Sequence, residues 1–66
     1  MEIVINGEPR EVQDGTRLGE LLRSLGTSPG PVAIELNGAV LPRSIHEETE
    51  LQANDQLEVV TFVGGG

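Results

Sequence analysis

Apolar and polar residues alternate along three stretches of the chain, which is the pattern of a β-strand with one buried face. Residues 1–6 carry apolar side chains at every odd position, with Val4 on the opposite side. Residues 32–37 and 57–63 alternate in the same way and contain several β-branched side chains. We therefore expect three strands here, of which the first and the last are the most apolar.

Four leucines follow the spacing i, i+3, i+4 and i+7, which gives one apolar stripe on an α-helix: Leu18, Leu21, Leu22 and Leu25. Thr16 is the predicted N-cap, and Gly26 is the predicted C′ residue that ends the helix. Gly19 lies inside this helix and costs about 1 kcal/mol relative to alanine. Two explanations for Gly19 stay open, a close approach of another backbone and an exposed position that tolerates the cost.

The dipeptide Asn-Gly, the strongest short-range hairpin signal, occurs twice because a type I′ turn needs positive φ at both central residues: Asn6-Gly7 and Asn37-Gly38. The first turn predicts a return strand over residues 8–13, and Pro9 places that strand at an edge of the sheet. The second turn predicts a brief strand at Val40-Leu41.

The order of elements is therefore strand, strand, helix, strand, short strand, strand. The two most apolar strands belong side by side in the middle of the sheet, and the crossover helix lets them run parallel. We predict an α+β fold in which a mixed sheet of four to five strands packs on one helix.

Residues 43–52 have no clean period, and we expect a turn of 3₁₀ helix that sends Leu51 and Ile45 into the core. His46 lies in this acid-rich segment and is expected to be solvated, since no second metal ligand stands at a useful spacing. The neighbouring acids are interpreted as a solvated edge, with a contact for basic residues of a partner as the alternative: Glu47, Glu48 and Glu50.

Size and composition exclude several classes of protein. The chain has 66 residues, 36% of them hydrophobic, and no cysteine, so we expect one domain without disulfides or thiolate metal sites. A core of this size does not enclose a substrate pocket of roughly 300 Å³ or more, which disfavours an enzyme acting alone. No leader opens the sequence and no apolar run approaches the roughly 18 residues of a membrane span, so we expect a cytoplasmic protein.

The charge is strongly negative, with eleven acidic residues against four Lys and Arg and a net charge of −7. Such a chain repels nucleic acid and anionic membranes, so neither is an expected partner. The charge favours a partner with a basic surface, although solubility alone also explains it. We expect a monomer when the protein is free.

The last predicted strand runs without a linker into glycines 64–66. Because glycine places little restriction on φ and ψ, this tail can pass through an opening too narrow for other residues. Its carboxylate is the one group of the chain that is suited to presentation to another molecule. A frayed end is the competing explanation, and a strand that leads directly into the glycines argues against it.

Five short motifs belong together in one known family, and the resemblance that they carry covers the whole chain: Asp14-Gly15-Thr16 at the helix entry, Leu21-Leu22, Asn37-Gly38, Leu41-Pro42-Arg43 and the ending Phe62-Val63-Gly64-Gly65-Gly66. In these motifs the chain resembles the ThiS family, the ubiquitin-like sulfur carriers of thiamine biosynthesis. The resemblance implies a single β-grasp (ubiquitin-like) domain over residues 1–66, with a flexible tail at residues 64–66.

The resemblance also implies a function as a sulfur carrier, a protein co-substrate that has no catalytic residue, cofactor or metal of its own. By the same resemblance, the Gly66 carboxylate is expected to be adenylated and converted to a thiocarboxylate that donates sulfur for thiazole formation. Gly64 and Gly65 let the tail thread into the active sites of partners. The implied partners are a ThiF-type adenylating enzyme, which uses ATP and Mg²⁺, a sulfur donor enzyme, and a thiazole synthase of the ThiG type.

A docking patch is expected on the open face of the sheet. The alternation of the last strand places Val60 and Phe62 on this face, beside Val4. Phe62 is the only aromatic residue of the chain and the expected contact anchor.

Two other functions stay open. A molybdopterin-type sulfur carrier or a ubiquitin-like modifier would use the same C-terminal activation with a different acceptor. A non-covalent interaction module would bind a partner through its acidic surface, and the glycines would take no part.

Overall fold

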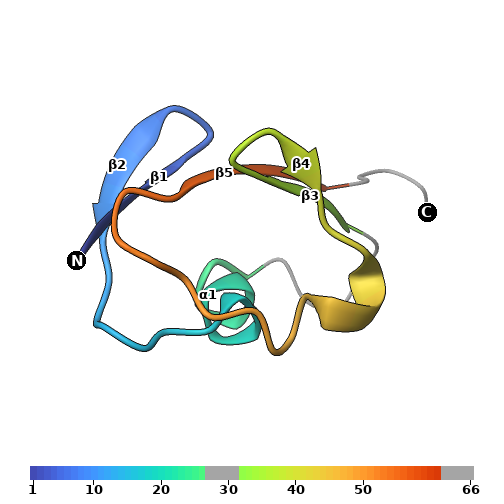
Figure 1. The fold of residues 1–66 in the computed structure, drawn as a ribbon, viewed down its shortest axis with the longest axis horizontal. Coiled ribbons are helices and arrows are strands. Elements are labelled where there is room, and N and C mark those ends of the chain that lie inside the picture. Colours follow the sequence, from blue (N-terminus) through green and yellow to red (C-terminus); the bar gives the residue numbers. More distant parts are fainter. Residues whose placement is uncertain (27–31, 62–66) are drawn as a thin grey trace.

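The computed structural model describes residues 1–26 and 32–61, which form a mixed five-stranded sheet and one α-helix in two layers (Figure 1). The sheet order is β2-β1-β5-β3-β4, and β1 runs parallel to β5 in the centre, which confirms the predicted placement of the first and last strands. The elements are β1 (Glu2–Ile5), β2 (Glu8–Glu11), α1 (Leu18–Ser24), β3 (Val32–Leu36), β4 (Ala39–Val40), the 3₁₀ turn η1 (Arg43–Ile45) and β5 (Gln56–Thr61).

Both Asn-Gly turns close antiparallel hairpins, as predicted. Asn6 and Asn37 adopt φ of 50° and 52°, and the glycines that follow them also have positive φ. The hairpin strands are β1 with β2 and β3 with β4. Pro9 lies on β2 at one edge of the sheet, where its missing N–H interrupts no internal ladder.

The core fills the space between the sheet and α1. The helix contributes the predicted leucine stripe, and every second residue of the three inner strands points toward it. Leu51 arrives from the segment after η1 and is 1% exposed, as expected. The buried apolar side chains are Ile3, Ile5, Leu18, Leu21, Leu22, Ile34, Leu51 and Leu57, with Leu25 and Val59 packed against them.

The prediction of Thr16 as the N-cap is wrong. The helix begins at Leu18 with Arg17 as its N-cap residue, and the Thr16 hydroxyl donates to the carbonyl of Gln13 instead. The Arg17 side chain has no acceptor atom and therefore cannot accept from the N–H groups of the first helical turn. The Glu20 carboxylate in that turn instead accepts a 3.0 Å hydrogen bond from the Arg17 backbone N–H. Gly26 has φ of +76° just after the helix, in agreement with its predicted role.

Neither explanation offered for Gly19 is correct. Gly19 is buried, and the atoms against it belong to the side chain of Glu47, whose carboxylate crosses this position to pair with Arg23. The segment that carries Glu47 is tied to the start of the helix because the Leu18 N–H donates to the Thr49 carbonyl at 2.7 Å.

Two expectations for residues 43–52 are also wrong. Ile45 is 43% exposed and stays outside the core, because η1 turns its side chain toward solvent. His46 is 8% exposed, and its ring Nε2 lies 2.9 Å from the Leu41 carbonyl. A carbonyl only accepts hydrogen bonds, so Nε2 carries a proton and donates it. The histidine is buried, and its hydrogen bond to Leu41 ties the segment after β4 to η1.

Candidate functional site: strand β5 and the open face of the sheet

Strand β5 lies in the middle of the sheet and is held from both sides by asparagine side chains. On one side, Asn6 extends the β1–β5 ladder after β1 has ended. Its Oδ1 accepts from the Val59 N–H at 2.8 Å, its Nδ2 donates to the Val59 carbonyl at 3.3 Å, and its own N–H donates to the Leu57 carbonyl. The amide therefore substitutes for the next residue of a strand.

On the other side, Asn37 secures the start of β5. Its Oδ1 accepts from the Gln56 N–H at 2.9 Å, and its Nδ2 donates to Asp55 at 3.1 Å. The buried Asp55 carboxylate also accepts from the Gln52 N–H at 2.7 Å, so it closes the turn that leads into the strand. The asparagines that permit the two hairpin turns thus also fix the position of β5.

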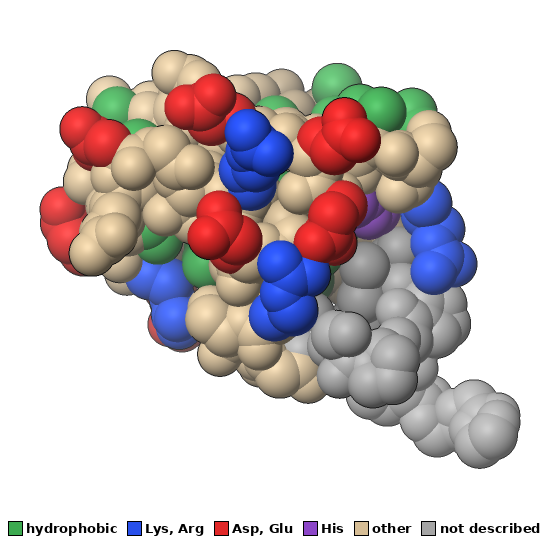
Figure 2. Space-filling model, turned by 90° about the horizontal axis from the view of Figure 1, so that it is seen from below, with side chains coloured by type: hydrophobic (Ala, Val, Ile, Leu, Met, Phe, Trp, Pro, Cys, Tyr) green, Lys and Arg blue, Asp and Glu red, His purple; other side chains and the backbone are tan. Residues whose placement is uncertain are grey.

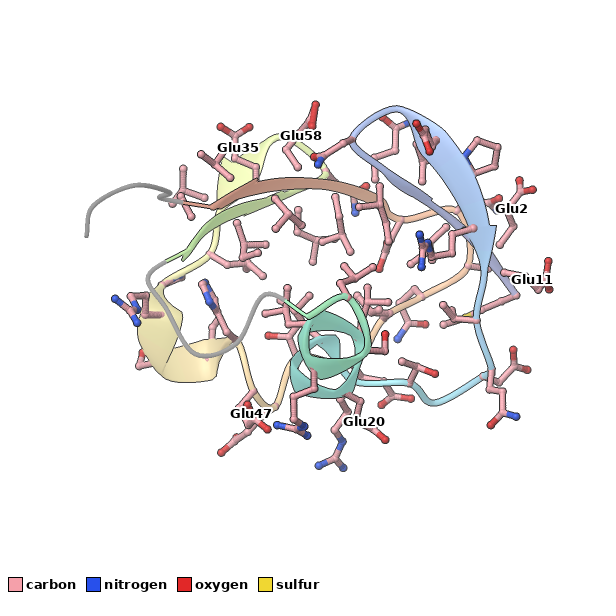
Figure 3. The ribbon with its side chains drawn as sticks, turned by 180° about the vertical axis from the view of Figure 1, so that it is seen from behind. Glu2, Glu11, Glu20, Glu35, Glu47 and Glu58 are labelled. Atoms are coloured by element: carbon pink, nitrogen blue, oxygen red, sulfur yellow. The ribbon has the colours of Figure 1, made fainter. Side chains whose placement is uncertain are left out.

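The open face is the side of the sheet that points away from α1 (Figure 3). The strand registers place on it the side chains that alternate with the core positions, and every charged side chain among them is a glutamate. These residues are Glu2, Val4, Pro9, Glu11, Ala33, Glu35, Val40, Gln56, Glu58 and Val60.

The structure corrects the predicted docking patch. Val60 is 53% exposed on the open face, as expected, and Val4 is half-buried on the same face. Val4 pairs with Gln56, however, four residues before Val60 on β5, which corresponds to about 13 Å along a strand. Glu58 lies between them on this face. Phe62 lies outside the described residues.

Two glutamates stand directly opposite each other in the centre of the open face. Glu35 on β3 and Glu58 on β5 are partners in the antiparallel register, and their carboxylates both point away from the helix (Figure 3). None of the four arginines of the sequence forms an ion pair with either glutamate in the described structure. The predicted site did not include this pair, because the alternation gives only the face of each residue and the register is needed to bring them together.

A shallow hollow of about 290 Å³ lies over β5 on the open face. Its rim includes Gly7 and Gly38 from the two hairpin turns. Figure 1 shows the β1–β2 turn and the β3–β4 turn close to each other beside β5. The hollow is lined by Val4, Gly7, Glu35, Gly38, Gln56, Leu57 and Glu58.

The helix side of the molecule has a different electrostatic character. Acidic and basic side chains alternate there (Figure 2), and Arg23 pairs with Glu47. Glu47 is therefore partnered within the chain, yet its side chain remains exposed like those of Glu48 and Glu50, so the interpretation of this segment as a solvated edge holds. The described residues contain no group of three metal-ligating side chains.

The remaining predicted site residues, Gly64, Gly65 and Gly66, lie outside the described part of the chain. The strand that leads to them, β5, is described as far as Thr61. No helix within residues 1–26 and 32–61 has the length and apolar character needed to cross a membrane.

Comparison with known proteins shows the family to which this chain belongs. Residues 3–66 match the ThiS family. A crystal structure of the thiamine biosynthesis protein ThiS from Geobacter metallireducens superposes with a TM-score of 0.81 at 35% identity, and the match covers both chains completely. A solution structure of a thiamine biosynthesis protein from the same organism gives a TM-score of 0.79 over 88% of its chain.

Two sequence relatives differ greatly in length. The chain is 48% identical over all of its 66 residues to a thiazole synthase of Magnetococcus marinus, and it spans only 20% of that protein. It is 42% identical to the uncharacterized protein ycf40 of Pyropia yezoensis and covers 93% of it. The chain thus spans about a fifth of the thiazole synthases that it matches.

Proposed function

Because the chain belongs to the ThiS family, we propose that it is a sulfur carrier of thiamine biosynthesis whose cargo is held on the Gly66 carboxyl group. The observation that supports this proposal best is the family match, which extends through the terminal glycines. The shared fold at a TM-score of 0.81 with a ThiS protein supports it independently of the tail sequence.

The chemistry follows from the properties of a carboxylate. A carboxylate is a poor electrophile because its charge repels nucleophiles and oxide is a poor leaving group. Attack of a Gly66 carboxylate oxygen on the α-phosphorus of ATP releases pyrophosphate and gives an acyl adenylate. A hydrosulfide ion from the sulfur donor then attacks the acyl carbon and AMP leaves as the carbon–sulfur bond forms, which produces a thiocarboxylate. The adenylating enzyme binds and uses ATP and Mg²⁺, and the carrier contributes only the acyl group.

The folded domain has the role of presenting the tail. The tail follows β5, and β5 is the strand that Asn6 and Asn37 hold from both sides. A tail that starts from a fixed strand searches a smaller volume than one that starts from a loop, which lowers the entropy lost when it enters an active site. We propose that Gly64 and Gly65 thread through the narrow entrance of each partner enzyme.

Mass spectrometry of the intact chain tests the proposal. After incubation with ATP, Mg²⁺, a ThiF-type adenylating enzyme and a sulfur source, we expect an AMP adduct or the exchange of one terminal oxygen for sulfur. A chain without Gly66 should bind the adenylating enzyme and form no such product. An unmodified mass of the complete chain, under conditions in which a known ThiS protein is modified, would contradict the proposal.

The alternatives give different results in the same experiment. A molybdopterin-type carrier or a modifier would also form the adenylate, and it would fail to support thiazole formation with a thiazole synthase of the ThiG type. A non-covalent module would keep its full activity when Gly66 is deleted. The relatives that are thiazole synthases favour the thiamine pathway, since each contains a segment similar to this entire chain.

Two of the three residues of the predicted docking patch remain part of the proposal, since Val4 is separated from Val60 on the open face. We propose that Phe62 and Val60 contact the adenylating enzyme, because an aromatic side chain next to the reactive tail buries much apolar surface on docking. The variant Phe62→Ala should weaken binding and leave the thermal unfolding of the domain unchanged. An unchanged affinity in a titration would remove Phe62 from the contact surface.

A further inference from the structure

We infer that the hollow over β5 receives the cationic side chain of an arginine or a lysine from thiazole synthase, which docks on the open face of the sheet. The inference rests on the proposed function, because that function supplies this partner. It adds the place of contact and the chemistry of the partner residue.

Glu35 and Glu58 are directly opposite each other on neighbouring antiparallel strands. Like charges in this position destabilise a sheet. No ion pair within the described residues offsets the repulsion, since Arg23 pairs with Glu47 and the other arginines pair with neither glutamate. Two carboxylates side by side match the planar fork of a guanidinium group and also attract an ammonium group.

A second pair on the same face shows how the chain offsets such repulsion elsewhere. Glu2 and Glu11 are also opposite each other, on β1 and β2. There the amino group of Met1 lies 3.1 Å from the Glu11 carboxylate and supplies the positive charge. The central pair Glu35 and Glu58 has no such cation in the described structure, so an incoming cation would offset its repulsion.

The shape of the hollow fits one long side chain. The carboxyl-bearing residues Glu35 and Glu58 line it together with the aliphatic side chain of Val4. The rim glycines Gly7 and Gly38 have open space beside them, since a Cβ added to either would meet nothing within 4 Å. A volume of about 290 Å³ lies below that of most small-molecule pockets. The methylene stem of an arginine or lysine can pack on Val4 while its charged end reaches the carboxylates.

Charge decides which macromolecule can dock there. All charged side chains of the open face are glutamates, so a second copy of this chain would bring negative charges together. A basic protein surface is complementary to this face, and the exposed Val40 and Val60 flank the glutamates with apolar area. Thiazole synthase is the partner on which we settle, because two relatives of this chain are thiazole synthases that contain a segment similar to it.

Calorimetric titration with thiazole synthase tests the inference. The double variant Glu35→Gln/Glu58→Gln keeps the shape of the hollow and removes its charge. We expect its affinity to fall by about tenfold or more, and the dependence of affinity on salt to become flatter. The single variants should each lose part of this affinity. Thermal unfolding should occur at the same or a higher temperature, which excludes misfolding as the cause.

Glu48→Gln is the matched control. It changes the net charge in the same direction at an exposed residue that lines a groove beside the N-cap residue Arg17 and the helix residue Glu20. Its affinity should stay within about twofold of the unchanged chain. Unchanged affinity of the double variant, or an equal loss in the control, would overturn the inference alone. If the unchanged chain did not bind thiazole synthase, the proposed partner would fail with it.

Discussion

The carboxylate of Glu47 occupies the space that a β-carbon on residue 19 would fill. A Cβ built on Gly19 would lie 2.5 Å from Cδ of Glu47, closer than real contacts allow. The Glu47 side chain crosses the helix at this point to reach Arg23, and it is 66% exposed. A flexible surface side chain, and not a neighbouring backbone or solvent, therefore lies against the helix at Gly19.

The variant Gly19→Ala should consequently have two effects of opposite sign. Alanine favours the helix by about 1 kcal/mol, and displacing Glu47 costs the surface ion pair, worth about 0–1 kcal/mol. In a Glu47→Ala background only the favourable effect remains. We expect Gly19→Ala to stabilise that background more than it stabilises the unchanged chain, as measured by urea unfolding. Equal effects in both backgrounds would show that Glu47 does not constrain residue 19.

The asparagine at position 6 is expected to be needed for its amide as well as for its backbone conformation. In Asn6→Asp the Nδ2 donor becomes an oxygen that faces the Val59 carbonyl, so one hydrogen bond is replaced by repulsion. Asn6→Gly keeps the positive φ and loses only the side-chain bonds. We expect both variants to be destabilised by about 1–3 kcal/mol, Asn6→Asp more than Asn6→Gly at neutral pH. The reverse order in urea unfolding would contradict this role.

Deprotonation of the Met1 amino group should lower the stability of the folded chain at alkaline pH. Its hydrogen bond and charge interaction with Glu11, together with Asp14, raise the pKa of this group above its usual 8.0, against a smaller effect of desolvation. A pKa raised in the folded state means that the stabilisation is complete below about pH 8 and is lost as pH rises through the folded pKa.

This pH effect can be isolated, because the sequence contains no lysine, tyrosine or cysteine to titrate in the same range. Urea unfolding of the chain that begins at Met1 should show a lower midpoint at pH 10 than at about pH 7. The variant Glu11→Gln should reduce this difference. An identical midpoint at both pH values would refute a stabilising role for the charged Met1 amino group.

Removal of one charge from the central glutamate pair should stabilise the isolated domain. Glu58→Gln relieves the repulsion with Glu35, and we expect the free energy of unfolding to rise by about 0.2–1 kcal/mol. The gain should shrink when the salt concentration is raised, because salt screens repulsion between exposed charges. Chemical unfolding at low and high salt measures both effects. A loss of stability at low salt would show that the pair is not repulsive.

His46 should be more important for stability than a solvated histidine would be. Its ring donates to the Leu41 carbonyl at 2.9 Å in a position that is 8% exposed. His46→Ala removes this donor and leaves a gap, so we expect a loss of about 1–3 kcal/mol in the free energy of unfolding. His46→Gln retains a donor and should lose less. The exposed neighbour Ser44 serves as the control, and Ser44→Ala should have little effect.

Much of the fold was predictable because it depends on local patterns. The leucine stripe of α1, the alternation in β1, β3 and β5, and the two Asn-Gly turns each express a preference of neighbouring residues. Those preferences were strong enough to place β1 and β5 side by side in the middle of the sheet as well, since the two most apolar strands have to be buried there. The terminal glycines and the family motifs indicated the proposed cargo site in the same direct way.

Other features depend on residues that are far apart in the sequence and meet only in the folded chain. The amide of Asn6 meets Val59, and the carboxylate of Glu47 lies against Gly19, through separations that no local period encodes. The register of β3 on β5 is what places Glu35 opposite Glu58. A shift of one residue would turn one of the two side chains into the core, so the acidic pair exists only because tertiary packing fixes that register.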